Sequence, residues 1–128
     1  MKHITSILFI LLFSANVFAG NLKAYFTFCT FSSPEDGPYI ETYLSVIGGS
    51  AIYSKTDHNT FQGKIEVTLV FKQGDVIKSY KKYNLLSPEI KDSLTERVNF
   101  MDQQRIPLPN GNYEFEVSIK DLNSANPS

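Results

Sequence analysis

Few residues of this chain are suited to acid–base or nucleophilic chemistry. Beyond residue 20 there is one histidine, His58, and the whole sequence holds one cysteine, Cys29. A nucleophile must lie within hydrogen-bonding reach of its base, and nothing in the sequence brings His58 to Cys29 or to a serine. Zinc needs three or four Cys, His or carboxylate ligands. We therefore expect no catalytic centre, no metal site and no cofactor, with His58 in a solvated loop and Cys29 as a small buried hydrophobe.

Two carboxylate patterns are compatible with chemistry but are better explained by structure. Glu114 and Glu116 lie two positions apart, roughly 6.5–7 Å along a strand, a spacing that suits the paired carboxylates of a glycosidase. The solvent face of any sandwich strand has the same pattern, and we favour this structural explanation. Calcium takes six to eight oxygens, whereas the segments 35–36 and 121–124 offer two or three each. The sequence therefore predicts a protein that is not an enzyme.

An aromatic strip is the most informative candidate for binding. Tyr39, Glu41 and Tyr43 fall on one face of a predicted strand, Tyr39 to Ile47. Exposed aromatic rings beside a carboxylate can stack on sugar rings or pack against a partner protein. These three residues are the predicted ligand or partner contacts. The alternative, which we favour, is that they are core or interdomain aromatics.

The elements that would position these residues are strands. The segment Lys64 to Lys72 alternates apolar and polar residues, as a strand with one face in a core and one in water does. Other expected strands are 22–31, 39–47, 76–83, 113–120 and a segment within 98–106. Gln73-Gly74-Asp75 predicts a tight turn, and Lys78, Lys81 and Lys82 indicate a protected sheet edge. Ser87-Pro88 predicts a short helical turn.

Composition and turn chemistry together predict the fold. The chain has 10 Phe, 7 Tyr and no Trp, a bias that favours strands. Its net charge of −1 gives no electrostatic footprint for nucleic acid or an anionic membrane. Tyr113 directly follows the turn 108–112, as in the tyrosine corner that opens the penultimate strand of immunoglobulin-like sandwiches. We predict an all-β, immunoglobulin-like antiparallel β-sandwich of six or seven strands.

This placement of Tyr113 leaves the sandwich without its last strand. The residues after Lys120 are loop-forming, so either the chain is the front part of a longer protein, which we favour, or the sandwich lacks that strand. In the second case the open sheet edge can accept a strand from another domain or envelope protein. That edge is the predicted route to a protein partner.

The first nineteen residues have the features of a cleavable export signal, in the expected order. Lys2 and His3 are followed by the apolar run 7–13, too short to span a hydrocarbon core of about 30 Å. Val17 and Ala19 place small residues before a cleavage site at Gly20. We predict a signal peptide over 1–19, a β-sandwich domain over 20–128 and no membrane span after cleavage. The predicted location is the periplasm or cell surface of a Gram-negative bacterium, because no lipid-accepting cysteine, disulfide pair or glycosylation sequon is present.

Four segments carry a resemblance to known proteins: 39–44 (YIETYL), 71–75 (FKQGD), 83–88 (YNLLSP) and 104–113 (QRIPLPNGNY). They resemble exported proteins of the Bacteroidota. Those chains begin with a signal peptide and an immunoglobulin-like sandwich, and several end in a domain named for a Gly-Trp-x-Thr-Asp motif, which this Trp-free sequence does not contain. The resemblance implies an exported N-terminal module, a structural or protein-interaction role, and no active-site residues.

Overall fold

The computed structural model describes residues 17–19, 21–92 and 94–124, and these form strands, turns and one 3-10 turn, η1 (Gly48–Ser50). The strands are β1 (Val17–Ala19), β2 (Leu22–Ser33), β3 (Gly37–Val46), β4 (Tyr53–Lys55), β5 (Phe61–Gln73), β6 (Val76–Leu86), β7 (Phe100–Pro107) and β8 (Glu114–Asp121). Within this part of the chain, no helix combines the length and apolar composition that crossing a membrane requires. Residues 1–16 of the predicted signal peptide lie outside the described residues.

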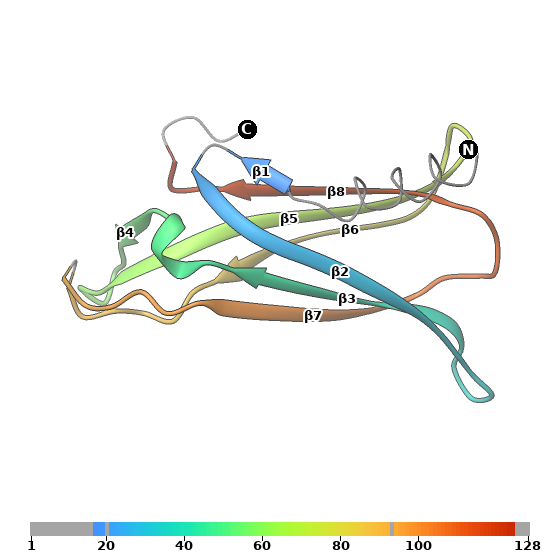
Figure 1. Ribbon diagram of the computed structural model, residues 1–128, viewed down its shortest axis with the longest axis horizontal. Coiled ribbons are helices and arrows are strands. Elements are labelled where there is room, and N and C mark those ends of the chain that lie inside the picture. The colour runs from blue at the N-terminus through green and yellow to red at the C-terminus, as the bar shows by residue number, and fades with distance from the viewer. Residues whose placement is uncertain (1–16, 20, 93, 125–128) are drawn as a thin grey trace, which may run out of the picture.

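The strands form two antiparallel sheets that face each other (Figure 1). One sheet has the order β1-β2-β3-β7, and in the other β5 is central, with β6 along one side and both β4 and β8 along the other. In one sheet, β2, β3 and β7 occupy the positions of strands A, B and E of an immunoglobulin-like sandwich. In the other sheet, β6, β5 and β8 occupy the positions of strands C′, C and F. The predicted fold class is confirmed, and the neighbour that strand F has in that fold, strand G, has no counterpart among the described residues.

Alternation along the strands places the core between the sheets. The inward residues of β5 are at most 1% exposed: Ile65, Val67, Leu69 and Phe71. Those of β3 are also buried: Ile40, Thr42, Leu44 and Val46. Burying one such large apolar side chain stabilises the fold by about 1.5–3 kcal/mol. The core of this sandwich is therefore built mainly on its two central strands, as the period-two patterns predict.

Turn residues define the hairpins. Gly74 has a φ of 61° in the two-residue turn that joins β5 to β6, with Gln73 opposite Val76. Glycine reaches this conformation without the clash that a Cβ creates. The predicted helical turn at Ser87-Pro88 is wrong, because the chain stays extended beside β5 as far as the bridge between Phe61 and Ile90.

The edge of the sandwich formed by β6 and β7 is closed by polar groups. Lys81 points inward from β6 and donates to the side-chain oxygen of Gln104 at 2.5 Å. Tyr83 Oη donates to Asp102 Oδ2 at 2.5 Å, and burial together with this hydrogen bond raises the pKa of Tyr83. Inward-pointing charge is a recognised way to prevent an edge strand from pairing with another chain. The prediction of a protected edge at β6 is thus supported by Lys81 in particular.

Candidate functional site

The residues considered for catalysis lie in separate parts of the fold. His58 lies in the loop between β4 and β5, where its side chain is 78% exposed and its Nδ1 is 3.2 Å from Glu89 Oε1. Cys29 lies in the middle of β2 and is exposed, so its predicted burial is wrong. Its side chain points outward from β2, on the face of the sheet that does not meet the other sheet. No group of three metal-ligating side chains occurs in the described ranges.

The carboxylates of β8 and its end have structural partners. Glu116 accepts a hydrogen bond from Lys72 Nζ at 2.9 Å on the exposed face of the sheet, and this contact raises the pKa of Lys72. Asp121 is buried, and its two oxygens accept from the backbone N–H groups of Ile52 at 2.8 Å and Asn123 at 3.0 Å. Asp121 therefore ties β8 to the segment before β4, and both of its carboxylate oxygens accept backbone hydrogen bonds.

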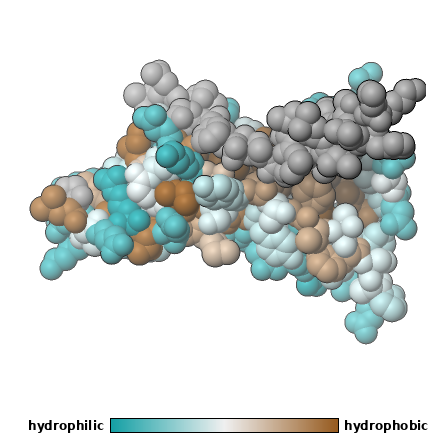
Figure 2. All heavy atoms as spheres, viewed as in Figure 1, coloured by the Kyte–Doolittle hydropathy of each residue, from teal (hydrophilic) through white to brown (hydrophobic). Residues whose placement is uncertain are grey.

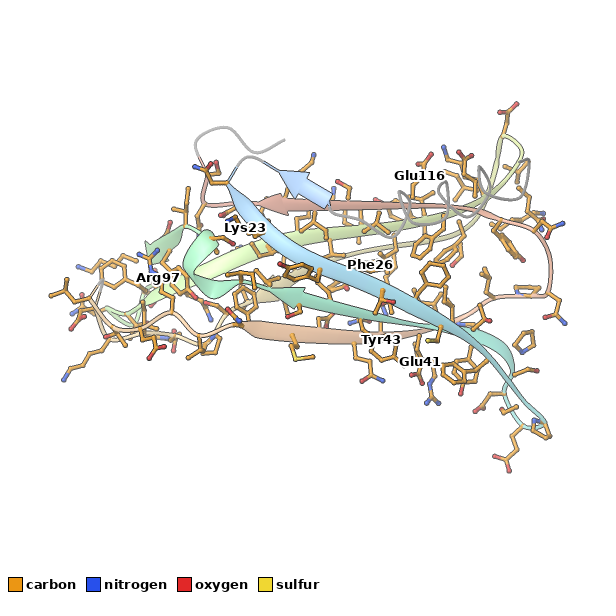
Figure 3. The ribbon with its side chains drawn as sticks, in the orientation of Figure 1. Lys23, Phe26, Glu41, Tyr43, Arg97 and Glu116 are labelled. Atoms are coloured by element: carbon orange, nitrogen blue, oxygen red, sulfur yellow. The ribbon has the colours of Figure 1, made fainter. Side chains whose placement is uncertain are left out.

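The predicted strip lies on the outer face of β3, with Glu41 at its centre. Glu41 Oε2 accepts from Tyr43 Oη at 2.5 Å and from Gln103 Nε2 at 3.3 Å, and Oε1 accepts from Arg105 Nη2 at 3.0 Å. The residue is only 8% exposed, although it faces away from the core. Figure 3 shows Glu41 and Tyr43 on the side of β3 opposite Phe26, which lies between the sheets. The carboxylate is thus fully engaged by its neighbours on β3 and β7.

Tyr39 is enclosed on both sides by neighbouring strands. Its ring stacks on that of Phe31 from β2, with centroids 5.4 Å apart and planes inclined by 20°. From β7, the guanidinium of Arg105 lies 4.6 Å from the centroid of the same ring. Because β2 and β7 flank β3 on opposite sides, these two side chains cover the ring from opposite directions. The Arg105 contact joins the predicted strip to a residue that sequence reasoning did not include.

Electrostatics in this cluster stabilise the ionised form of Glu41 and the neutral form of Tyr43. The hydrogen bond from Tyr43, followed by contacts with Arg105 and Gln103, lowers the pKa of Glu41 despite its burial. The same hydrogen bond, with burial, raises the pKa of Tyr43 to about 12. Glu41 likewise raises the pKa of Arg105. A carboxylate held ionised by three donors is poorly suited to proton transfer near neutral pH.

A second candidate surface lies along one lateral side of the sandwich, between β2 and β8, and we call it the β2/β8 seam. The ring centroid of Phe115 in β8 is 5.7 Å from that of Phe26 and 5.4 Å from that of Phe28, both in β2. Phe28 is 46% exposed although it points inward. The apolar core therefore reaches the surface at this seam. Figure 2 shows apolar residues among polar ones on the face in view.

Hollows lie at both ends of the β2/β8 seam. One of about 760 Å³ lies where β2 begins and β8 ends, and its lining includes Leu22, Ala51 and Asp121. Another, of about 420 Å³, lies where β2 ends and β8 begins, and its lining includes Phe31 and Tyr113. The seam thus has a hollow at each end and packed phenylalanine rings between the two hollows.

Tyr113 anchors the start of β8 beside the second of these hollows. Its hydroxyl donates to the carbonyl oxygen of Pro109 at 2.6 Å, the backward hydrogen bond that a tyrosine corner makes. Tyr113 also packs against the core. Its geometry is that of a structural residue at the point where the chain enters β8.

The backbone of β8 offers hydrogen-bonding groups on the side away from β5. Leu122 N–H donates to the carbonyl of Lys64, which lies directly opposite in the register. Because bonded and non-bonded pairs alternate in an antiparallel ladder, the even-numbered residues of β8 bond to β5. Phe115, Val117 and Ile119 therefore direct their N–H and C=O groups to the outer edge, where no described strand pairs with them.

Sequence reasoning anticipated an open edge but not the seam beside it. The segment 22–31 is rich in aromatic residues, yet only the pairing of β2 with β3 identifies which of these rings point inward. No protein-family model, no curated protein and no solved structure matches this chain. The fold and the contacts above are therefore the basis for a functional proposal.

Proposed function

We propose that this chain is an exported, non-catalytic β-sandwich module that binds other polypeptides by strand addition at β8, with a structural or protein-interaction role in the cell envelope. One observation carries the proposal. Phe115, Val117 and Ile119 direct backbone donors and acceptors to an edge without a strand neighbour in the described residues. An extended segment added there gains main-chain hydrogen bonds and side-chain contacts in the same step.

The difference between the two lateral sides of the sandwich supports this choice of edge. The β6 edge carries the inward-pointing Lys81 and its polar partners on β7. The β2/β8 seam instead has phenylalanine rings at the surface and a hollow at each end. Natural sheets protect edges that must not pair, so an unprotected edge beside exposed phenylalanine rings fits a binding role.

The export part of the proposal is supported by the sequence of residues 1–19. Their basic start, short apolar run and small residues before Gly20 follow the order of a signal peptide. The resemblance to exported Bacteroidota proteins points to the same compartment. The absence of a cysteine among residues 1–20, where a lipid would be attached, supports the periplasm or the cell surface as the location.

A nine-residue peptide that alternates valine with lysine tests strand addition directly. Titrated into ¹⁵N-labelled protein beginning at Gly20, at a dilution where the protein is monomeric, it should shift the amide signals of Phe115, Val117 and Ile119. Those of β6 should stay unchanged. Val117→Pro removes an outward N–H at a position where edge strands tolerate proline, together with a valine side chain that packs against the core, and should abolish the shifts. Shifts on β6, or equal binding by the variant, would refute the proposal.

The alternative, a carbohydrate or peptide site at Tyr39, Glu41 and Tyr43, has less support. The ring of Tyr39 already stacks on Phe31 and holds the guanidinium of Arg105 4.6 Å from its centroid, so a sugar would compete with both contacts. Both oxygens of Glu41 and the hydroxyl of Tyr43 are already hydrogen-bonded within the protein. A ligand would have to displace these contacts before it gained its own.

A further inference from the structure

We infer that β8 pairs with β8 of a second copy of this chain, forming a two-fold symmetric dimer centred on Val117. The inference rests on the proposed function and specifies that the polypeptide added at β8 is a second copy of this chain. Antiparallel pairing about Val117 places Phe115 opposite Ile119 of the other copy and Glu114 opposite Lys120. The sequence of β8 is thus complementary to itself in this register.

The alternation of backbone hydrogen-bonding groups along β8 agrees with this register. A register centred on an odd-numbered residue pairs odd with odd, and Phe115, Val117 and Ile119 are the residues whose N–H and C=O groups face the free edge. In the dimer these groups form the hydrogen-bonded pairs of an antiparallel ladder. β8 then joins the two β6-β5-β8 sheets into one continuous sheet.

Side chains on both faces of β8 fit the same register. On the solvent face, each Glu114 meets a Lys120 at both ends of the interface, and Glu116 meets Ser118. On the core face, Phe115 meets Ile119 and the two Val117 side chains meet on the axis. Opposite charges and aromatic–β-branched pairs are the favourable cross-strand combinations.

Neighbouring symmetric registers are less favourable. Centring on Phe115 places Glu114 opposite Glu116, and like charges directly opposite destabilise a sheet. Centring on Ile119 places the core-facing Asp121 opposite Val117 and leaves Glu114 without a cross-strand partner. Charge and polarity therefore select the register about Val117.

The seam indicates what else the second copy covers. Phe28 is 46% exposed and packs edge-on against Phe115, so a strand beside β8 approaches this apolar surface. In the full chain β1 pairs with the start of β2 and lies beside β8 (Figure 1). Cleavage before Gly20 removes β1, so the β8 edge no longer has β1 beside it. The buried core residues all lie between Leu22 and Ile119, so the chain beginning at Gly20 keeps the whole described core.

Sedimentation velocity over a range of concentrations measures the predicted association of protein beginning at Gly20. Glu114→Lys and Lys120→Glu should each weaken it roughly tenfold, because each reversal creates two like-charge pairs per dimer. The double variant E114K/K120E restores opposite charges across the interface and should return to near the original affinity. Val117→Pro should leave a monomer.

Within one chain, Glu114 lies opposite Lys72 and Lys120 opposite Glu66 in the β5–β8 pairing. An effect on folding alone would therefore accumulate in the double variant instead of disappearing, and thermal unfolding of each variant monitors it. Recovery of association in the double variant supports the dimer even if Val117→Pro does not fold.

Three results would overturn the inference: a monomer at all concentrations, association insensitive to both charge reversals, or no recovery in the double variant. Binding of the valine–lysine peptide by a chain that remains monomeric would refute the second copy and leave strand addition standing. A chain that neither binds the peptide nor self-associates would refute both.

Discussion

The rings of Phe28 and Phe115 meet edge-on across the two sheets, with centroids 5.4 Å apart and planes inclined by 74°. Phe28 belongs to the part of β2 that lies beyond its pairing with β1, and Phe115 belongs to the edge strand β8, so this contact spans the lateral side where the core reaches the surface. The same Phe115 ring stacks on Phe71 with centroids 4.2 Å apart. Phe115 therefore links the buried core to the exposed seam.

Truncation of these two rings should have unequal effects on stability. Phe115→Ala removes contacts with Phe26, Phe28 and Phe71, and we expect a loss of about 3–5 kcal/mol in the free energy of unfolding. Phe28→Ala removes a half-exposed ring and should cost less than half of that. Urea denaturation of both variants measures the difference. Equal losses would mean that the seam is not an exposed surface in solution.

The glycines of η1 form a matched pair for testing close backbone packing. A Cβ added at Gly48 would lie 2.0 Å from the carbonyl oxygen of Val98, whereas one at Gly49 would meet no atom within 4 Å. Gly48→Ala should destabilise the protein by about 1–3 kcal/mol or more, and Gly49→Ala should leave its stability nearly unchanged. Thermal unfolding compares the two. Indifference at position 48 would contradict the described path of the chain before β7.

Loss of the Tyr113 hydroxyl should have a modest effect on stability. Tyr113→Phe keeps the ring but removes the hydrogen bond to the Pro109 carbonyl, and one such bond contributes about 1 kcal/mol. Tyr80→Phe changes an exposed tyrosine of β6 and should alter stability by less than about 0.5 kcal/mol. Chemical denaturation provides the comparison, and an equal effect of the two changes would argue against a tyrosine corner.

The Glu41 cluster should make stability depend on pH at both extremes. The pKa of Glu41 is lowered from 4.5 in the folded protein, so its contribution is present above that value and is lost as pH falls through the lowered pKa. The pKa of Tyr43 is raised from 10.0 to about 12, so its contribution is present below pH 10 and is lost as pH rises through about 12.

Substitution of Glu41 should remove the loss of stability that occurs as the pH falls through the pKa of this residue. Glu41→Gln is expected to lower the melting temperature at neutral pH, because Arg105 and Tyr43 lose a charged acceptor. The difference in melting temperature between Glu41→Gln and the original protein should shrink as the pH falls below about 4. Melting curves from about pH 7 to about pH 3 test this. A constant difference across that range would show that the Glu41 charge does not act in the folded state.

Local patterns were sufficient for much of the fold. The alternation in Lys64 to Lys72 and Tyr113 to Lys120 gives the inward face correctly, since side chains alternate with period two in any strand. Turn residues located the connection at Gly74, and the turn before Tyr113 located the tyrosine corner. Local pattern was misleading at Ser87-Pro88, where bonding to β5 keeps the chain extended.

The sequence by itself determined that this protein is an all-β sandwich, which face of each clear strand is apolar, and where Tyr39, Glu41 and Tyr43 share a side. Only the tertiary structure decided that Arg105 meets Glu41, that Cys29 is exposed, and that Phe28 lies at an open seam. The physical reason is that these facts depend on which strands become neighbours and in what register. Pairing between β3 and β7 joins segments about sixty residues apart, and no local pattern encodes it.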